Sequence, residues 1–519
     1  MYTKTHHKFV LYISVFILLV SACSNQVNTI PTSAPTEQVT PSPVRELEEV
    51  ECRTPNPQLI KMTCYDLLVP EDRLSTNSNM IRLHVAIFKS KSSTPATDPI
   101  LFLSGGPGQP GIPFILYINS YSGFVGSNRD VIVFDQRGTG ESQPSLACPE
   151  VDQFYEETLT QFFPQAPFNQ MLNETWLKCK ERLTTLGVNL DAYNSSTSAA
   201  DVEDLRRALN IEKWNLFGIS YGTRLALAVM RDFPNGVRSA VLDSVFPLPE
   251  TLKDYQYQDI NKNGSIQYLI NRCKDDVDCN KAYPDLENTL TTLVNKLNES
   301  PINITSQYRT GVGWSNGPEV VLTGNRLLET LFFMMYSVND IPYIPQLIAN
   351  TQNEDVELVS RYVLTLPPIQ ANAMSISVIC VDNLSLTNKL PELVSPTSLE
   401  KLWFDFINNT NQIQELCQSW VSNITITQNE TDFASDIPSL LLAGEFDPAT
   451  PVWLAELTKE NLSNSYLYQF SGYGHSLTTS DANTNGCVGK LMVSFWNDPT
   501  IQPDDKCMTD VNLRKFITE

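Results

Sequence analysis

The chain has 519 residues, of which 42% are hydrophobic, and its 58 acidic and 36 basic side chains give a formal net charge of −22. A chain this acidic repels phosphate backbones, so no nucleic acid is expected as a partner. The length exceeds that of one ordinary domain core, which predicts a second domain or a large insertion.

The N-terminal segment is typical of a bacterial secretion signal. Two lysines precede an apolar run over residues 9–20, which is shorter than the roughly 20 residues of a membrane-spanning helix. The run leads to Val-Ser-Ala-Cys, which resembles a lipoprotein cleavage box; the alternatives are an ordinary signal peptide or a plain membrane anchor. The resemblance implies removal of residues 1–22, a lipid anchor on Cys23 and an extracytoplasmic, membrane-anchored protein of a bacterial cell envelope. Residues 23–50, which begin with a Ser-, Thr- and Pro-rich stretch, are expected to form a flexible tether.

Cysteine usage agrees with export. Without Cys23, ten of the 11 cysteines remain, an even number that suits disulfides in an oxidising compartment. No Cys-x-x-Cys motif occurs and histidine is scarce, so no metal site is expected. Sequence alone leaves the connectivity open, and the simplest pairing joins neighbours along the chain: Cys52–Cys64, Cys148–Cys179, Cys273–Cys279, Cys380–Cys417 and Cys487–Cys507.

Strands and helices alternate over the first half of the chain. An alternating pattern predicts an early strand over residues 81–88. Apolar residues at helical spacing predict a helix over residues 198–209, with Ser198 as its N-cap, and another over 223–233. Short continuous apolar runs suit strands buried on both faces of a parallel sheet, and they predict four more strands, over residues 99–103, 130–134, 214–217 and 237–245.

This alternation stops over residues 246–436, where helices are predicted between Pro-rich segments, including 326–336 and 399–407. We interpret this stretch as a lid inserted between two parts of one core, residues 51–245 and 437–519. Ligands of open α/β sheets bind at the carboxyl ends of the strands, so such a lid would control substrate access. The alternative is a separate second domain. The rest of the chain predicts two strands and a closing helix, over residues 437–443, 466–470 and 487–496.

Three residues have the chain order of a hydrolase triad. Ser220 lies in Gly-Ile-Ser-Tyr-Gly, a Gly-x-Ser-x-Gly motif between an apolar strand and an apolar helix. Asp447 and His475 follow in the order found in α/β-hydrolases, each just after a predicted strand. We expect His475 to take the proton of the Ser220 hydroxyl, and Asp447 to orient the imidazole. Asp243, at the end of an earlier predicted strand, is the rival acid.

Histidine is scarce enough to make the assignment of the base testable. His6 and His7 lie in the predicted signal segment, and His84 is expected on a strand, facing solvent or a neighbour. His475 is therefore the candidate base.

A glycine-rich loop, Ser-Gly-Gly-Pro-Gly from Ser104, follows the strand predicted over residues 99–103. Glycines let backbone N–H groups approach a developing oxyanion. We therefore expect the N–H groups of Gly105 and Gly106 to act with that of Tyr221, the residue after the nucleophile. A phosphate-binding loop is the alternative, but the Gly-x-x-x-x-Gly-Lys pattern is missing.

Five motifs in one order are similar to those of the secreted tripeptidyl aminopeptidase and proline iminopeptidase group of α/β-hydrolases: Gly-Gly-Pro-Gly, Asp-Gln-Arg-Gly-Thr-Gly-Glu-Ser, Gly-Ile-Ser-Tyr-Gly-Thr, Gly-Glu-Phe-Asp-Pro-Ala-Thr-Pro and Gly-Tyr-Gly-His-Ser. The similarity spans about residues 99–496 and is weakest in the predicted lid. It implies an α/β-hydrolase fold, with a mostly parallel central sheet and a large, mainly helical lid insertion. It also implies Ser220, Asp447 and His475 as the triad, and the glycine loop with Tyr221 as the oxyanion hole.

The resemblance further implies release of residues or short peptides from free N-termini, with acidic groups of the lid holding the amine. Asp382 is our candidate for such a group, and the alternative is a surface acid beside a disulfide. The family's glycine loop often begins with His, where this chain has Ser104. Asp135 and Arg137 are expected to brace the loop after their strand through an ion pair or backbone hydrogen bonds.

The sequence thus predicts a serine exopeptidase that forms an acyl-enzyme on peptides with a free N-terminus and uses no metal or organic cofactor. A carboxylic ester hydrolase with the same triad is the first alternative, because amide and ester hydrolysis share this machinery. An inactive binding protein on a hydrolase fold is the second, and the complete, ordered triad argues against it.

Overall fold

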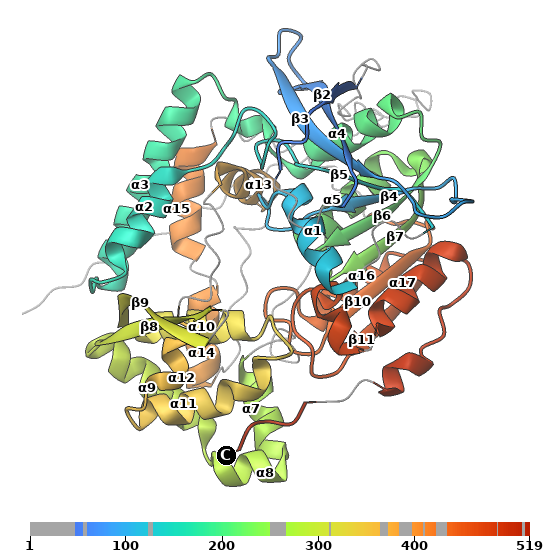
Figure 1. The fold of residues 1–519 in the computed structure, drawn as a ribbon. Helices are drawn as coiled ribbons and strands as arrows, with labels where there is room; N and C mark the ends of the chain where they lie inside the picture. The colour runs from blue at the N-terminus through green and yellow to red at the C-terminus, as the bar shows by residue number, and fades with distance from the viewer. Residues whose placement is uncertain are drawn as a thin grey trace, which may run out of the picture. The chain divides into compact units, whose positions relative to one another are not determined.

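A nine-stranded sheet forms the centre of the computed structural model, in the order β1-β2-β3-β5-β4-β6-β7-β10-β11 (Figure 1). Three strands at one edge pair antiparallel, and the six from β5 to β11 are parallel. The mostly parallel sheet predicted from the apolar runs is confirmed. The strands are β1 (Glu48–Val50), β2 (Thr63–Pro70), β3 (Met80–Phe88), β4 (Ile100–Leu103), β5 (Val131–Phe134), β6 (Trp214–Ile219), β7 (Val237–Asp243), β10 (Ser439–Gly444) and β11 (Ser465–Phe470).

The structure describes residues 47–54, 60–122, 128–249, 266–310, 313–363, 372–383, 397–407, 410–421, 433–484, 486–510 and 514–518. The predicted signal segment, Cys23 and most of the predicted tether lie outside these residues. The tether as predicted runs too far, because Glu48–Val50 pair with β2 as an edge strand. Within the described ranges, no helix is long and apolar enough to cross a membrane.

Helices cover both faces of the sheet because its inner strands are apolar on both sides; every residue of β4, β5, β6 and β10 is buried. One face packs against α4 (Ser195–Ala208), α5 (Tyr221–Asp232) and α16 (Val452–Glu460). The other packs against α1 (Gly111–Ser122) and α17 (Cys487–Asn497). Because helices cover both faces of the sheet, the site must lie at the ends of the strands.

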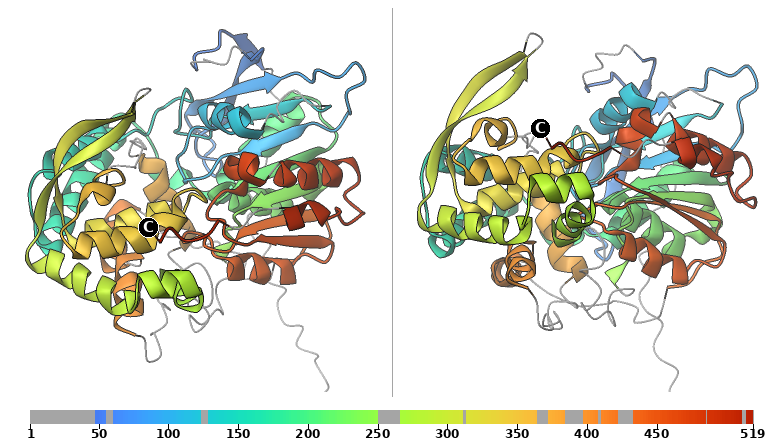
Figure 2. Two further views of the ribbon diagram at one scale, coloured as in Figure 1. Left: turned by 60° about the horizontal axis from the view of Figure 1, so that its bottom comes forward. Right: turned by 90° about the horizontal axis from the view of Figure 1, so that it is seen from below.

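A mainly helical insertion separates β7 from β10, and Figure 2 shows its yellow-green to orange helices gathered to one side of the sheet. It also contains a long hairpin, β8 (Ile302–Thr310) with β9 (Gly313–Leu322), that the sequence analysis missed. Its helices are α7 (Ile266–Asp275), α8 (Val277–Ala282), α9 (Leu286–Glu299), α10 (Gly324–Met334), α11 (Ile344–Gln352), α12 (Glu357–Ser360), α13 (Ala373–Asn383), α14 (Ser398–Ile407) and α15 (Thr410–Trp420).

Two helices from the first part of the chain join this layer. The helices α2 (Pro149–Thr158) and α3 (Gln165–Thr185) share an apolar cluster with α13 and α15. The predicted boundary at residue 246 therefore leaves part of the helical layer inside the segment assigned to the core.

The N-cap predicted for the helix before β6 is wrong. That helix, α4, begins at Ser195, and the side chain of Asn194 accepts a hydrogen bond from the N–H of Thr197. Ser198 lies inside the helix and is buried. An Asn side chain caps as well as a Ser, so the amphipathic pattern, which starts later than the helix, misplaced the cap.

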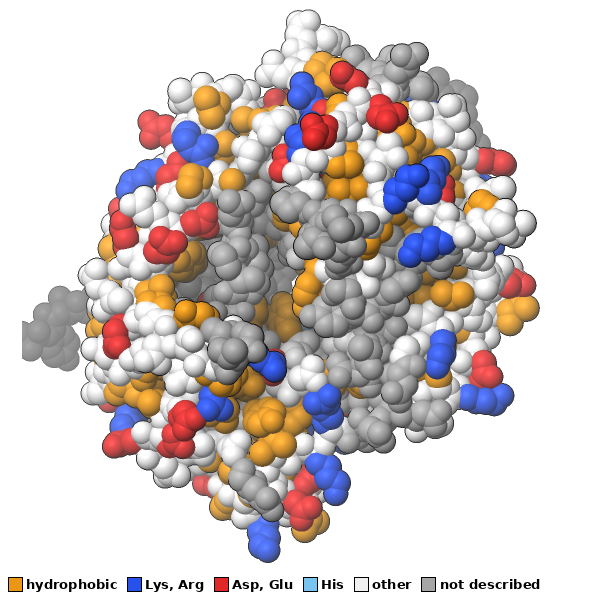
Figure 3. Space-filling view, in the orientation of Figure 1, with side chains coloured by type: hydrophobic (Ala, Val, Ile, Leu, Met, Phe, Trp, Pro, Cys, Tyr) orange, Lys and Arg blue, Asp and Glu red, His pale blue; other side chains and the backbone are white. Residues whose placement is uncertain are grey.

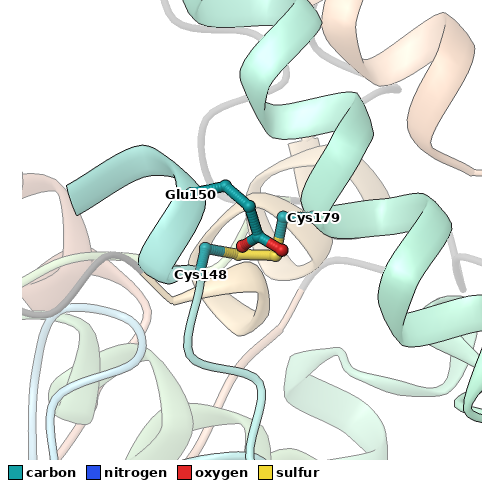
Figure 4. Close-up of side chains that lie close together, drawn as sticks. All are labelled: Cys148, Glu150 and Cys179. Atoms are coloured by element: carbon teal, nitrogen blue, oxygen red, sulfur yellow. A yellow bond between two sulfur atoms is a disulfide. The ribbon is translucent and has the colours of Figure 1, made fainter. Parts of the chain in front are cut away.

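Five disulfides confirm the pairing of sequence neighbours: Cys52–Cys64, Cys148–Cys179, Cys273–Cys279, Cys380–Cys417 and Cys487–Cys507. Within the described residues, the group of side chains whose atoms could approach one metal ion is Cys148, Glu150 and Cys179 (Figure 4). Its two sulfurs are bonded to each other, and its carboxylate accepts from Arg182 Nε at 2.5 Å. This group is therefore a disulfide beside an ion pair.

Candidate active site

Ser220 occupies a sharp turn between β6 and α5. Its φ of 56° and ψ of −125° are strained for a residue with a side chain. A Cβ atom on Gly218 would lie 2.4 Å from the carbonyl oxygen of Gly222, and one on Gly222 would lie 2.0 Å from that of Leu103. Only glycine fits at either position. The strand, strained turn and helix form the context in which a Gly-x-Ser-x-Gly motif presents its serine.

Asp447 and His475 meet at the ends of β10 and β11. The imidazole Nδ1 lies 2.9 and 2.8 Å from the two carboxylate oxygens of Asp447. The carboxylate is itself held by the backbone N–H groups of Ala449 and Thr450 and by the Thr450 hydroxyl at 2.7 Å. Both residues are buried. The acid can thus fix the tautomer and orientation of the ring.

The pKa of His475 reflects two opposing effects. Burial disfavours the charged imidazolium and lowers the pKa. The attraction of Asp447, its hydrogen bond and the more distant charge of Asp243 raise it, and together they leave the pKa above the ordinary 6.5. The site therefore stabilises the imidazolium that forms when His475 accepts a proton.

The dipeptide Asp243-Ser244 at the end of β7 connects the serine turn to the histidine loop. The carbonyl of Asp243 accepts the N–H of Ser220 at 3.0 Å. Its carboxylate accepts the N–H groups of Leu477 and Thr478 and the Thr478 hydroxyl, and the Ser244 hydroxyl oxygen accepts the N–H of Ser476 at 2.7 Å. Asp243, the rival acid, binds this loop, and the acid bonded to the imidazole is Asp447.

The glycine loop after β4 lies against the serine turn. A Cβ atom on Gly105 would be 2.9 Å from the carbonyl oxygen of Ile219 and 3.6 Å from the hydroxyl oxygen of Ser220. Gly106 has a φ of 107°, which only glycine adopts readily. Tyr221, whose N–H is the expected second donor, is the first residue of α5. The three expected oxyanion donors thus belong to two adjoining segments.

Hydrogen bonds from side chains hold the glycine loop in place. The Ser104 hydroxyl donates to the carbonyl of Gln109 at 2.8 Å, and Gln136 Nε2 donates to the carbonyl oxygen of Ser104 at 3.0 Å. Ser104 thus ties the loop to its own backbone where the family often has His. Asp135 accepts the N–H groups of Ile112 and Glu141, as expected of a bracing residue.

Arg137 has a structural role away from the serine turn. Its guanidinium forms a bidentate ion pair with Asp201 of α4, at 2.7 and 2.8 Å, and also donates to the backbone carbonyl of Ala192. His84 lies on β3, fully buried, with Nδ1 2.9 Å from Asp66 Oδ1. It faces a neighbour, one of the two orientations expected.

The insertion contacts the candidate triad directly, which the sequence analysis did not foresee. Tyr336, just after α10, lies against His475 with ring centroids 4.5 Å apart. A Cβ atom on Gly474 would lie 1.8 Å from the carbonyl oxygen of Met335. Glu445 joins a second helix to the same loops, because it accepts both the N–H of Gly472 and the hydroxyl of Tyr268 on α7.

Two acids of the insertion differ in their surroundings. Asp382, on α13, accepts the hydroxyl of Ser195 at 2.5 Å and the N–H of Ser195 at 3.3 Å. Glu329, on α10, is half-buried and forms no hydrogen bond with another described residue. Burial raises the pKa of Glu329, against the opposing attraction of Arg326. A single acid within the apolar sequence of α10 is the signal that could have identified it.

Comparison with known proteins agrees with this arrangement. Residues 98–327 match the family model described as the alpha/beta hydrolase fold, and residues 404–507 match that of the TAP-like protein. YuaR of Escherichia coli, a protein named as a hydrolase, is 23% identical over 454 residues, which is 84% of this chain and 85% of that one.

Several relatives that match over a shorter stretch are named as peptidases. The serine protease Hip1 of Mycobacterium tuberculosis is 28% identical over 38% of this chain and 39% of its own. The tripeptidyl aminopeptidase of Streptomyces coelicolor is 28% identical over 35% of each chain. These matches span well under two thirds of either peptidase. With the sheet, the serine turn and the family models in agreement, the chain belongs to the α/β-hydrolases, and its residues 404–507 are similar to the TAP-like protein family.

Proposed function

We propose that this α/β-hydrolase is a serine hydrolase with Ser220 as nucleophile, His475 as base and Asp447 as the acid that orients it. The observation that carries the proposal is the buried Asp447–His475 pair, whose loop is joined to the turn of Ser220 by the hydrogen bonds of Asp243. An oriented imidazole that can accept the proton of a serine hydroxyl is the arrangement that activates an alcohol.

The reaction follows from these positions. The Ser220 oxygen attacks the substrate carbonyl carbon while its proton passes to His475. The oxyanion accepts hydrogen bonds from the N–H groups of Tyr221 and of Gly105 or Gly106. The carbon–nitrogen bond then breaks, and the imidazolium returns the proton to the leaving amine. Water, deprotonated by His475, releases the acyl group and restores the serine.

We propose peptides with a free N-terminus as substrates. The peptidase names of the relatives support this class. Glu329 supports it from the structure, because a half-buried carboxylate without a hydrogen-bond partner among the described residues suits a protonated amine. It lies on α10, seven residues before Tyr336, whose ring contacts His475. Figure 3 shows acidic and basic side chains interspersed over the face in view.

A substrate panel tests this proposal. The purified chain is assayed with a peptide amide bearing a free N-terminus, the same peptide N-acetylated, and a short acyl ester. We expect turnover of the free-amine peptide that is lost in Ser220→Ala. Glu329→Gln should raise KM for the free-amine peptide and leave ester hydrolysis unchanged. Turnover of the ester alone would favour the ester hydrolase, and turnover that survives Ser220→Ala would refute the proposed nucleophile.

We also propose that the protein is extracytoplasmic and held at the membrane by a lipid on Cys23. The five disulfides support an oxidising compartment. Expression with a radiolabelled fatty acid should label the wild type, and Cys23→Ser should abolish the label. Equal labelling of both proteins would refute the anchor.

A further inference from the structure

A chain of three side chains runs from the insertion to the residue after the nucleophile. Asp382 of α13 accepts the hydroxyl of Ser195 at 2.5 Å, and the Ser195 hydroxyl oxygen lies 3.0 Å from the hydroxyl of Tyr221. The N–H of Ser195 donates to the other carboxylate oxygen. Ser195 is the first residue of α4, and Tyr221 is the first residue of α5. These side chains therefore join a helix of the insertion to two helices of the core.

This connection is shielded from solvent. The exposed fractions of Asp382, Ser195 and Tyr221 are 8%, 5% and 1%. Hydrogen bonds gain strength where water is excluded. The disulfide Cys380–Cys417 and an apolar cluster that includes Tyr221 hold α13 in place. The carboxylate therefore has a fixed position from which to orient its partners.

Tyr221 links this hydrogen-bonded connection to the proposed reaction. Its N–H is an expected donor to the oxyanion, and the residue begins α5 directly after the strained turn. We propose that Asp382 is a positioning residue: through Ser195 it holds Tyr221 so that the Tyr221 N–H points at the developing oxyanion. This inference rests on the proposed function.

The positioning role differs from the amine-binding role that the sequence suggested for Asp382. Both carboxylate oxygens of Asp382 accept from Ser195, whereas Glu329 forms no hydrogen bond within the described part of the chain. A positioning residue acts on every substrate, because each one forms the oxyanion. An amine ligand acts only on substrates that have the amine.

Asp382→Asn and Ser195→Ala test the proposal with the free-amine peptide and the ester. We expect kcat to fall by about 10- to 100-fold on both substrates, less than the 10²–10³ typical of removing a donor outright, with KM within about twofold. The double variant should lose little more than either single variant, because both act through one connection. Ser195→Thr, which keeps a hydroxyl, should restore most of kcat.

A matched control separates this role from a general effect of losing a buried acid. Asp204, also buried on α4, pairs with Arg73 at 2.9 Å, and Asp204→Asn should lower stability without changing kcat. Ser195→Ala breaks the same connection within the core, so the test stands even if Asp382→Asn does not fold.

The possible outcomes are distinct. A loss confined to free-amine substrates, with raised KM, would assign Asp382 to amine binding and overturn the proposal. Unchanged kcat on both substrates, with turnover that still depends on Ser220, would also overturn it and leave the proposed function intact. Wild-type turnover that survives Ser220→Ala would instead refute the proposed function.

Discussion

Tyr336 of the insertion lies against the imidazole of His475, with ring centroids 4.5 Å apart and the ring planes at 51°. The insertion therefore contacts the proposed catalytic base directly. The contact between Gly474 and the carbonyl of Met335 holds the same end of α10 to the histidine loop.

We expect the aromatic ring of Tyr336 to contribute more to kcat/KM than its hydroxyl does. An aromatic pair contributes about 0.5–1.5 kcal/mol, so Tyr336→Ala should lower kcat/KM by roughly 2- to 10-fold. Tyr336→Phe keeps the ring, and its kcat/KM should stay near that of the wild type. A large loss in Tyr336→Phe would instead indicate that the hydroxyl contacts the substrate.

The pH dependence of kcat/KM should reflect the raised pKa of His475. Only the neutral imidazole can take the serine proton, so activity should rise with pH through an inflection above 6.5. Asp447→Asn removes the attraction that raises the pKa, and it should move the inflection down and lower kcat by about 10⁴-fold. An inflection below 6.5 in the wild type would contradict this account.

Gly105→Ala should block the approach of the glycine loop to the nucleophile. The added methyl would lie 2.9 Å from the carbonyl oxygen of Ile219 and 3.0 Å from the Cβ atom of Ser220, so the loop must move away. A displaced donor should cost about 10²–10³ in kcat. Gly187→Ala is a control with no atom within 4 Å of its new methyl and a strained φ of 86°; it should lower stability slightly and leave kcat unchanged.

We expect Asp243→Asn to lower mainly the stability of the protein, and Asp447→Asn to lower mainly kcat. Asp243→Asn leaves at least one buried donor of Leu477 or Thr478 unsatisfied, which should cost about 1–3 kcal/mol of the free energy of unfolding. Its kcat should fall far less than that of Asp447→Asn. Denaturation midpoints and kcat for both variants check this, and a larger kcat loss in Asp243→Asn would reverse the assignment of the acid.

Local patterns predicted most of the sheet and the candidate triad. The apolar runs identified β4, β5, β6 and β10 because strands buried on both faces need apolar residues at every position. Strand β2, next to the edge strand β1, mixes Thr, Asp and apolar residues, and the hairpin β8–β9 carries many polar side chains. Neither gives a distinctive periodic signal.

Contacts between distant segments could not be predicted. Asp382 and Ser195 are 187 residues apart, and nothing local to either residue indicates the other. The contact of Tyr336 with His475 depends likewise on how the insertion folds back onto the sheet. By contrast, the disulfide pairs are sequence neighbours, with separations of 6 to 37 residues, and could be predicted.

In the proposed mechanism, His475 activates Ser220. Fluorophosphonates react with activated serines, and mass spectrometry of the digested protein locates the adduct. We predict a single adduct, on the peptide that contains Ser220, with a labelling rate reduced by orders of magnitude in His475→Ala. Labelling of a different serine, or equal rates in the wild type and His475→Ala, would contradict the claim.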